Sequence, residues 1–371
     1  MKQRIEYIDA LRGFTMILVV FAHLEGFCLL KEGFGSLTPL NSLFQSFRMP
    51  LFFFVSGFIA FKTTSHGRGG ERFFRASIKK AKVIIPTLFF GLIYTYLYID
   101  KDLNFFITDA AKGGYWFTLV LLEIFIIYYI VNLLLPLQGN VEKSRLVDKW
   151  TIALICLSIF LYLIKLPLKL NPTLQLFGDI TSLHYTCEYF QFFSFGLLSA
   201  RYSKVTTNIL GNSKLCAITI ISFFTLWYIK TYYIVPHETF SIDYWKIIAT
   251  VFDSLTGYLG ILTIFGCFRK YQNYLSTATK VGRLLSFIGR RTLDIYLLHY
   301  FFLSPMPSIG AWLEKNPNIV IELSTGLILS LLIIGCCLVI SQLLRTSNFL
   351  AQWLFGAKKT IVPDTHKHIT T

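Results

Sequence analysis

Apolar stretches follow one another from the start of the chain almost to its end, separated by short polar segments. A helix that crosses a bilayer needs about 20 consecutive, mostly apolar residues. Runs of this kind lie near residues 8–24, 43–61, 83–99, 115–137, 151–164, 186–200, 215–229, 247–268, 284–304 and 323–344. We therefore predict an all-α polytopic membrane protein, built as a bundle of about ten transmembrane helices.

The basic residues are distributed unequally between alternate polar segments. If the N-terminus lies in the cytoplasm, the segments on that side carry 26 Lys and Arg residues, and those on the opposite side carry 8. Cytoplasmic loops of membrane proteins are enriched in Lys and Arg, so the distribution predicts cytoplasmic N- and C-termini. We expect one transmembrane domain over residues 1–356, followed by a short cytoplasmic tail at residues 357–371.

The composition agrees with a membrane environment. Hydrophobic residues make up 54% of the chain and charged residues 15%, whereas soluble domains carry about 25% charged residues. A net charge of +15 in a soluble protein would suggest a nucleic-acid partner. Here the bias toward cytoplasmic loops accounts for the charge, so we expect no nucleic-acid partner.

Neither the cysteines nor the first apolar run indicates another class of protein. The seven cysteines are scattered and form no C-x-x-C pair, which argues against a disulfide framework or a zinc site, and we expect no metal. Asp9 and Arg12 interrupt the beginning of the first run. This pattern favours a retained first helix over a cleaved signal peptide.

A few ionisable residues fall inside the apolar runs instead of the polar segments. They are Arg48, Glu123, Glu188, Asp253, Asp294, His23 and His299. A charged residue at the centre of a spanning helix costs about 2.5–3.5 kcal/mol on insertion scales, and such residues usually face a functional cavity. The alternative is that some of them form interhelical ion pairs or lie near the membrane interface.

The first helix carries the most informative pair. Arg12 and His23 are eleven positions apart, which is three turns plus roughly 20° and about 16 Å along an α-helix. The two side chains therefore share one face. Asp9 precedes Arg12 by three positions, a spacing at which a carboxylate and a guanidinium can pair.

Residues 9–13 (DALRG) followed by His23 resemble the first-helix motif of the acyltransferase-3 family of bacterial membrane acyltransferases, whose hallmark is Arg-x10-His. Residues 47–57 (FRMPLFFFVSG) are similar to the family's second-helix motif. Trp116 and Phe117 resemble its Trp-Phe-Leu motif, and residues 289–299 (GRRTLDIYLLH) are similar to its late Gly-x-x-Ser-Leu-x-Ile-Tyr-Leu-x-His motif. The likeness covers nearly the whole chain and is greatest to the branch that contains fucose-type sugar O-acetylases.

Two positions depart from the family pattern. Arg48 stands where the branch often has His. The family also often has a cytoplasmic Arg-x-x-Arg motif before its third helix. In this chain either Lys79 and Lys82 or the earlier Arg72 and Arg75 correspond to it.

The resemblance implies an enzyme of the bacterial inner (cytoplasmic) membrane. It implies transfer of an acyl group, commonly acetyl, from acyl-CoA to a hydroxyl of a cell-envelope glycan sugar, as in polysaccharide O-acetylation. Acyl-CoA would be the donor substrate, with no bound cofactor, and the partners would be the donor, the sugar acceptor and membrane lipid. The pantetheine arm would run up between the helices toward His23.

Residue roles follow from combining the resemblance with side-chain chemistry. His23 is the candidate general base, because an imidazole with a pKa near 6.5 can deprotonate a hydroxyl. The catalytic candidates are His23, Arg12 and Asp9. The candidates for holding the acceptor, stabilising the oxyanion or orienting His23 are Arg48, Glu123, Glu188, Trp116, Tyr296, His299 and Asp294. The candidates for the CoA phosphates are Arg12, Arg72, Arg75, Lys79 and Lys82, because basic side chains bind phosphate.

Several alternatives remain open at the level of the sequence. Buried charges also suit a sugar or lipid-linked glycan transporter or flippase, and a non-catalytic scaffold of an envelope assembly is a further possibility. The basic segment at residues 62–82 is also explained by topology alone. Tyr296 and His299 fit an interfacial aromatic belt. Ser56 is either a covalent relay or, beside Gly57, part of a close helix contact.

Overall fold

The computed structural model describes residues 5–29, 39–64, 70–135, 148–234 and 243–356. Within these ranges every regular element is a helix, as predicted. The α-helices are α1 (Glu6–Leu24), α2 (Pro39–Thr64), α3 (Gly70–Tyr94), α4 (Leu103–Thr108), α5 (Phe117–Leu134), α6 (Lys149–Leu170), α7 (Pro172–Thr181), α8 (Leu183–Arg201), α9 (Ser203–Gly211), α10 (Ser213–Ile229), α12 (Asp243–Lys270), α13 (Lys280–Arg290), α14 (Thr292–Leu298), α15 (Pro307–Lys315), α16 (Ile319–Leu344) and α17 (Asn348–Phe355). Shorter 3₁₀ and π segments are η1 (Glu25–Leu29), η3 (Thr95–Ile99), η4 (Lys112–Gly114), η5 (Lys230–Ile234) and η6 (His299–Phe302).

Seven helical segments of the described residues are long and apolar enough to cross a membrane. They are Glu6–Leu29, Pro39–Lys62, Ala81–Ile99, Phe117–Leu134, Ser213–Ile234, Ile247–Lys270 and Ile319–Leu344. The predicted helical fold with several candidate membrane-spanning helices is therefore confirmed for the described residues. The count of about ten helices and the cytoplasmic placement of both termini stay predictions, and the tail at 357–371 lies outside the described residues.

The other three apolar runs take different forms. The runs at 151–164 and 186–200 lie within α6 and α8, which are continuous helices but are not among the seven candidate spans. The run at 284–304 does not form one helix. It is divided at Arg291, whose backbone (φ −114°, ψ 19°) is not helical, between α13, α14 and η6. A single spanning helix over 284–304 was therefore the wrong expectation.

Two pairs of helices pack through glycines at close range. A Cβ atom added to Gly13 of α1 would lie 2.0 Å from the carbonyl oxygen of Leu285 in α13, and one added to Gly289 would lie 1.8 Å from that of Asp9. In the same way, Gly57 of α2 lies against Phe193 of α8. Small residues allow helix backbones to approach closely in a membrane. The glycines of the sequence motifs thus serve helix packing, including Gly57 beside Ser56.

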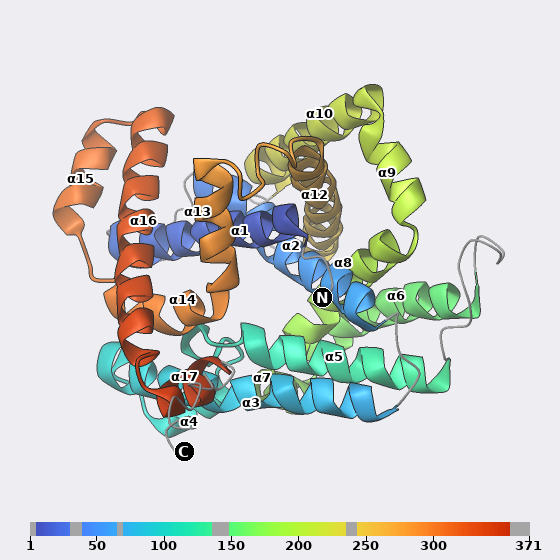
Figure 1. Ribbon diagram of the computed structural model, residues 1–371, viewed down its shortest axis with the longest axis horizontal. Coiled ribbons are helices and arrows are strands. Elements are labelled where there is room, and N and C mark those ends of the chain that lie inside the picture. The colour runs from blue at the N-terminus through green and yellow to red at the C-terminus, as the bar shows by residue number, and fades with distance from the viewer. Residues whose placement is uncertain (1–4, 30–38, 65–69, 136–147, 235–242, 357–371) are drawn as a thin grey trace, which may run out of the picture.

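These contacts place α1 and α2 in the middle of the molecule (Figure 1). Figure 1 shows α3 and α5 side by side along one edge, while α10 and α12 lie together on the opposite side of α2. The late helices α13, α14 and α16 all contact α1. The first helix is therefore surrounded by elements from both ends of the chain, and these elements enclose the candidate site.

Candidate functional site

A cavity of about 520 Å³ lies between α1, α2, α5 and α14. Ligand pockets typically have volumes of roughly 300–1,000 Å³ and mostly apolar walls with a few polar groups. The apolar wall consists mainly of Met16, Val19, Met49, Phe52, Val55, Ile59, Phe117, Leu121, Leu122, Phe125 and Leu293. Polar groups from Arg12, His23, Arg48 and Thr292 interrupt this wall. The cavity thus has a mostly apolar wall that is interrupted by the basic side chains of Arg12, His23 and Arg48.

Arg12 and His23 both line this cavity, as expected for two side chains on one face of α1. Met16 and Val19 lie between them on the same helix and line the cavity as well. The guanidinium of Arg12 donates a hydrogen bond to the hydroxyl of Thr292 at 2.8 Å. Thr292 begins α14, so this contact joins the first helix to the late motif.

His23 contacts His299, the last residue of the same late motif, and Tyr300, which directly follows it. Its Nδ1 lies 3.0 Å from Nε2 of His299, and its Nε2 lies 3.3 Å from the hydroxyl of Tyr300. The rings of His23 and His299 are stacked, with centroids 5.2 Å apart. None of the carboxylates expected to orient the base, namely Glu123, Glu188 and Asp294, takes this place among the described hydrogen bonds. The partner of His23 is instead a second histidine.

The hydrogen bonds of His299 determine which nitrogen of each ring carries a proton. Nδ1 of His299 lies 3.0 Å from the carbonyl oxygens of both Ile295 and Tyr296. Carbonyl oxygens only accept hydrogen bonds, so this nitrogen must be the donor. In a neutral ring Nε2 of His299 is then the acceptor, and Nδ1 of His23 donates to it. The lone pair of His23 therefore lies on Nε2.

The end of α14 explains why His299 has this orientation. A helix leaves its last four carbonyl groups without partners from the next turn. The chain tightens into the 3₁₀ segment η6 at His299. The imidazole then reaches back along the helix to the carbonyls of Ile295 and Tyr296. The end of α14 at His299 is thus what positions the partner of His23.

The segment from Asp109 to Trp116 contributes Gly114 and Trp116 to the cavity wall. The carboxylate of Asp109 accepts hydrogen bonds from the backbone of Ala111 and Gly113. The ammonium group of Lys112 donates to three backbone carbonyls, including that of Asp179 at 2.8 Å. Burial lowers the pKa of Lys112, while nearby Asp109 and Asp179 act in the opposite direction. These contacts fix the segment before α5.

Gly114 connects this segment to the histidine pair. It has φ 99°, a conformation that strongly favours glycine. Its carbonyl oxygen accepts a hydrogen bond from the hydroxyl of Tyr300 at 3.2 Å. A Cβ atom at this position would lie 2.2 Å from the same hydroxyl. The same hydroxyl lies 3.3 Å from Nε2 of His23, so its single proton can go either to Gly114 or to the lone pair of His23, and that lone pair is available to a ligand when Tyr300 donates to Gly114.

Arg48 enters the cavity from α2, two residues before Pro50. Its Nη1 atom is buried and has no hydrogen-bond partner among the described residues. A buried donor left without an acceptor costs about 1–3 kcal/mol, more when it is charged. Arg48 therefore lines the same cavity as His23 and has an unsatisfied guanidinium donor buried at its wall.

Aromatic rings form the wall next to Arg48. Trp116 lines the cavity and stacks on Tyr185 of α8 with centroids 4.3 Å apart. Tyr189, one turn further along α8, stacks on Phe53 at 4.7 Å. Tyr296 also lines the cavity and contacts Phe117 edge to face. Trp116 and Tyr296 thus both line the cavity, and their roles toward a ligand stay predictions.

Three other predicted acidic residues do not line the cavity. Asp9 is buried on α1, where its backbone packs against α13. Glu123 accepts a hydrogen bond from the hydroxyl of Thr186 on α8. Glu188 pairs with Lys165 of α6 at 2.6 Å. The interhelical-pair alternative therefore holds for Glu188, and neither Glu123 nor Glu188 is positioned to hold an acceptor in this cavity.

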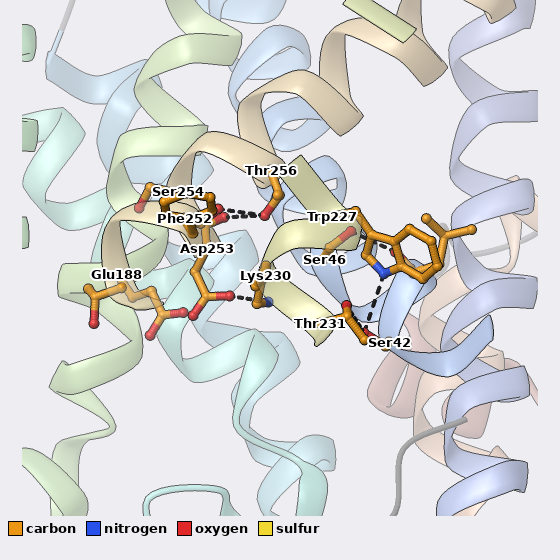
Figure 2. Close-up of polar contacts among 12 residues, drawn as sticks. Ser42, Ser46, Glu188, Trp227, Lys230, Thr231, Phe252, Asp253, Ser254 and Thr256 are labelled. Atoms are coloured by element: carbon orange, nitrogen blue, oxygen red, sulfur yellow. Dashed lines mark hydrogen bonds and ion pairs between the residues drawn. The ribbon is translucent and has the colours of Figure 1, made fainter. Parts of the chain in front are cut away.

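The remaining carboxylates of the apolar runs are also paired. Figure 2 shows the side chain of Asp253 directed at Lys230, with which it forms an ion pair. In the same view Ser42 joins Thr231 and Trp227, which ties α2 to the end of α10. Asp294 binds Arg345 of the segment after α16 at 2.8 Å. Asp253 and Asp294 thus hold helices together.

The basic residues considered for the CoA phosphates lie on α3. The side chains of Arg72, Arg75 and Lys79 lie outside the part of the chain whose side chains the structure describes. Lys82 is exposed, and its neighbour Val83 lines the cavity. A phosphate-binding role for these residues therefore stays a prediction.

Sequence reasoning missed Thr292, Gly114 and Tyr300. All three are uncharged, so a search for charged residues inside apolar runs does not select them. Tyr300 directly follows the late motif, and its position beside His299 was the available signal. No group of three or more His, Cys, Asp or Glu residues with metal-binding geometry occurs in the described ranges.

Comparison with known proteins identifies the family. Residues 5–344 match the model of a family described as an acyltransferase domain, the acyltransferase-3 family. No curated protein and no solved structure matches the chain. The match extends over nearly the whole described chain and includes every residue of the cavity. The chain therefore belongs to the acyltransferase-3 family of membrane acyltransferases.

Proposed function

We propose that this protein transfers an acyl group, most simply acetyl, from acyl-CoA to a sugar hydroxyl of a cell-envelope glycan. Membership of an acyltransferase family supports the reaction class. The observation that carries the proposal is the cavity shared by Arg12 and His23, because it joins a cationic end to an imidazole with a defined lone pair. The likeness to sugar O-acetylases in the sequence motifs supports the choice of acceptor.

The donor enters at the Arg12 end in this proposal. Arg12 lies about 16 Å from His23 along α1 at 1.5 Å per residue. The phosphates of acyl-CoA would bind at this basic end, where Arg can form paired hydrogen bonds to phosphate. The slender pantetheine arm would occupy the apolar middle between α2 and α5 and bring its thioester to His23.

His23 and Arg48 divide the chemical step. The sugar hydroxyl gives its proton to Nε2 of His23 as its oxygen bonds to the thioester carbon. The carbonyl oxygen becomes negative, and the free donor of Arg48 stabilises it. When the intermediate collapses, the carbon–sulfur bond breaks, the thiolate of CoA leaves, and the proton on His23 passes to it. The products are the sugar ester and CoA.

His299 acts as a positioning residue in this scheme. It fixes the tautomer and the ring orientation of His23 through one hydrogen bond. It also offers the charged form of His23 a neighbouring acceptor while the proton is held. Tyr300 and Gly114 define the other side of the same imidazole.

Mass spectrometry of envelope glycans tests the proposal. Cells with the protein should carry glycan species heavier by one acyl group, and cells without it should lack them. Expression of the His23→Ala variant in cells that lack the protein should not restore the heavier species, although the variant reaches the membrane in normal amount. Identical glycans with and without the protein, together with a change in the amount of glycan outside the cell, would favour a transporter instead.

A further inference from the structure

A second cavity of about 560 Å³ lies on the other side of α2 from the first. It is bounded by the beginning of α1 and α10, by the end of α2 and α12, and by α9. The two cavities share no lining residue. On α2, Ser56, Ile59 and Ala60 face the first cavity, whereas Phe58 and Lys62 face the second. The second cavity is therefore a separate site.

Cationic and hydroxyl groups surround this second cavity. Its basic lining residues are Lys62, Lys204, Arg269 and Lys270, and its hydroxyl-bearing residues include Ser203, Thr207 and Ser213. No Asp or Glu is among its described lining residues. The guanidinium of Arg269 donates to the hydroxyl of Thr207, which joins α12 to α9 across the cavity. Such a set suits the several oxygens of a phosphate group.

Apolar side chains form another part of the cavity wall and also lie next to the cavity. Ile5, Phe58 and Leu210 line it. Next to it, α9 and α10 expose further apolar side chains, namely Val205, Ile209, Leu215 and Ile218. The candidate membrane spans of α1 and α10 begin beside this cavity, and those of α2 and α12 end beside it. The cavity thus lies where four candidate spans end, with an apolar surface beside a cationic one.

We propose that the second cavity binds a phosphate ester, carried by the head group of an anionic phospholipid. Basic pockets between membrane helices bind anionic head groups, and the exposed apolar side chains of α9 and α10 are available to the acyl chains. The inference rests on this cavity and does not depend on acyl transfer. A soluble phosphate would present the same oxygens but would leave the apolar surface unused.

Lipid binding to the full-length protein in nanodiscs of phosphatidylcholine tests this proposal. Phosphatidylglycerol is added, and its retention is measured by native mass spectrometry. The double variant Lys62→Gln/Arg269→Gln should bind phosphatidylglycerol about tenfold or more weakly, because each basic group near an anionic lipid contributes favourably. The matched control is Lys280→Gln/Arg283→Gln, which removes the same charge from exposed positions on α13.

The possible results distinguish lipid phosphate from inorganic phosphate, and they distinguish lipid binding at the second cavity from acyl transfer at the first. Equal loss in both double variants would show diffuse surface attraction and overturn the site. Binding of inorganic phosphate without retention of phosphatidylglycerol would overturn the assignment to lipid. Thermal unfolding of each variant checks that the fold is intact. Lipid retention in a protein that transfers no acyl group would support this site while contradicting the proposed function.

Discussion

Two hydrogen bonds of His299 decide which nitrogen of His23 can take up a proton. The carbonyls of α14 force Nδ1 of His299 to donate, and its Nε2 then accepts from His23. The lone pair of His23 is then on Nε2, and His23 lines the same cavity as Arg12 and Arg48. At the scale of single residues, the proposed base therefore depends on a partner 276 positions away in the sequence.

Replacing His299 tests this dependence. We expect His299→Leu to lower kcat by about tenfold to a hundredfold, which is part of the 10²–10⁴-fold that general base catalysis typically contributes. His299→Gln places an amide oxygen where it can accept from Nδ1 of His23 and should recover part of the loss. The measurement is the initial rate of acyl transfer. Equal rates for the Leu and Gln variants would contradict a positioning role through the hydrogen bond.

Replacing Arg48 tests the proposed stabilisation of the oxyanion. We expect Arg48→Leu to lower kcat by about 10²–10³-fold, as for the loss of a donor to a developing negative charge. Arg48→His should keep more activity, since a histidine can also donate and is common at this position in the related branch. Normal kcat in Arg48→Leu with a raised KM for the sugar would assign the residue to acceptor binding instead.

The sequence predicted the Arg12–His23 pair of this site, because both residues belong to one helix. The spacing of Arg12 and His23 was sufficient to place them on one face. The sequence did not predict which residue contacts His23, because periodicity carries no information about contacts between distant helices. Glu123 and Glu188 were reasonable candidates as buried carboxylates, but Thr186 and Lys165 bind them elsewhere.

At the scale of helices, close glycine contacts set the positions of the elements that carry the site. Gly13 and Gly289 bring α1 and α13 together, and Gly57 and Gly196 bring α2 and α8 together. The first pair fixes α1 relative to the late motif that supplies His299. Backbones at this distance leave no room for a side chain, so these positions are sensitive to size.

We expect Gly57→Leu to lower the stability of the protein by about 1–3 kcal/mol, because overpacking forces backbones and side chains apart. The matched control is Gly335→Leu on α16, where an added Cβ meets no atom within 4 Å. That variant should be neutral or slightly more stable. Thermal unfolding in detergent measures both. Equal stability of Gly57→Leu and the wild-type protein would mean that α2 and α8 do not pack as described.

Hydropathy predicted where most of the long helices lie, but it did not predict where one of them breaks. The run at 284–304 is apolar on average, yet it divides at Arg291. Asp294, three residues later, binds both Arg291 and Arg345. A hydropathy window averages over such anchoring contacts, which depend on residues far apart in the chain.

At the scale of the whole molecule, the distribution of basic residues predicts the orientation in the membrane. The second cavity collects four of the basic residues that this distribution assigns to the cytoplasmic side. The Arg12 end of the first cavity belongs to the same set. The orientation therefore determines whether the donor can arrive from the cytoplasm, where acyl-CoA is made.

Reporter fusions test this orientation. A fluorescent protein that matures only in the cytoplasm should be bright when it is fused after residue 371, because positive segments stay on the cytoplasmic side. A fusion within the segment at 305–322 should be dark. Alkaline phosphatase at the same two positions should give the opposite pattern. An external C-terminus would contradict the predicted topology and remove the cytoplasmic route to Arg12.

The rate of acyl transfer by the His23→Ala variant tests the central claim most directly. Purified protein in nanodiscs receives labelled acetyl-CoA together with isolated envelope glycan, and labelled glycan is measured over time. We predict that His23→Ala lowers kcat by about 10²–10⁴-fold, while its thermal unfolding matches that of the wild-type protein. Transfer at the wild-type rate by this variant would contradict the assignment of His23 as the base.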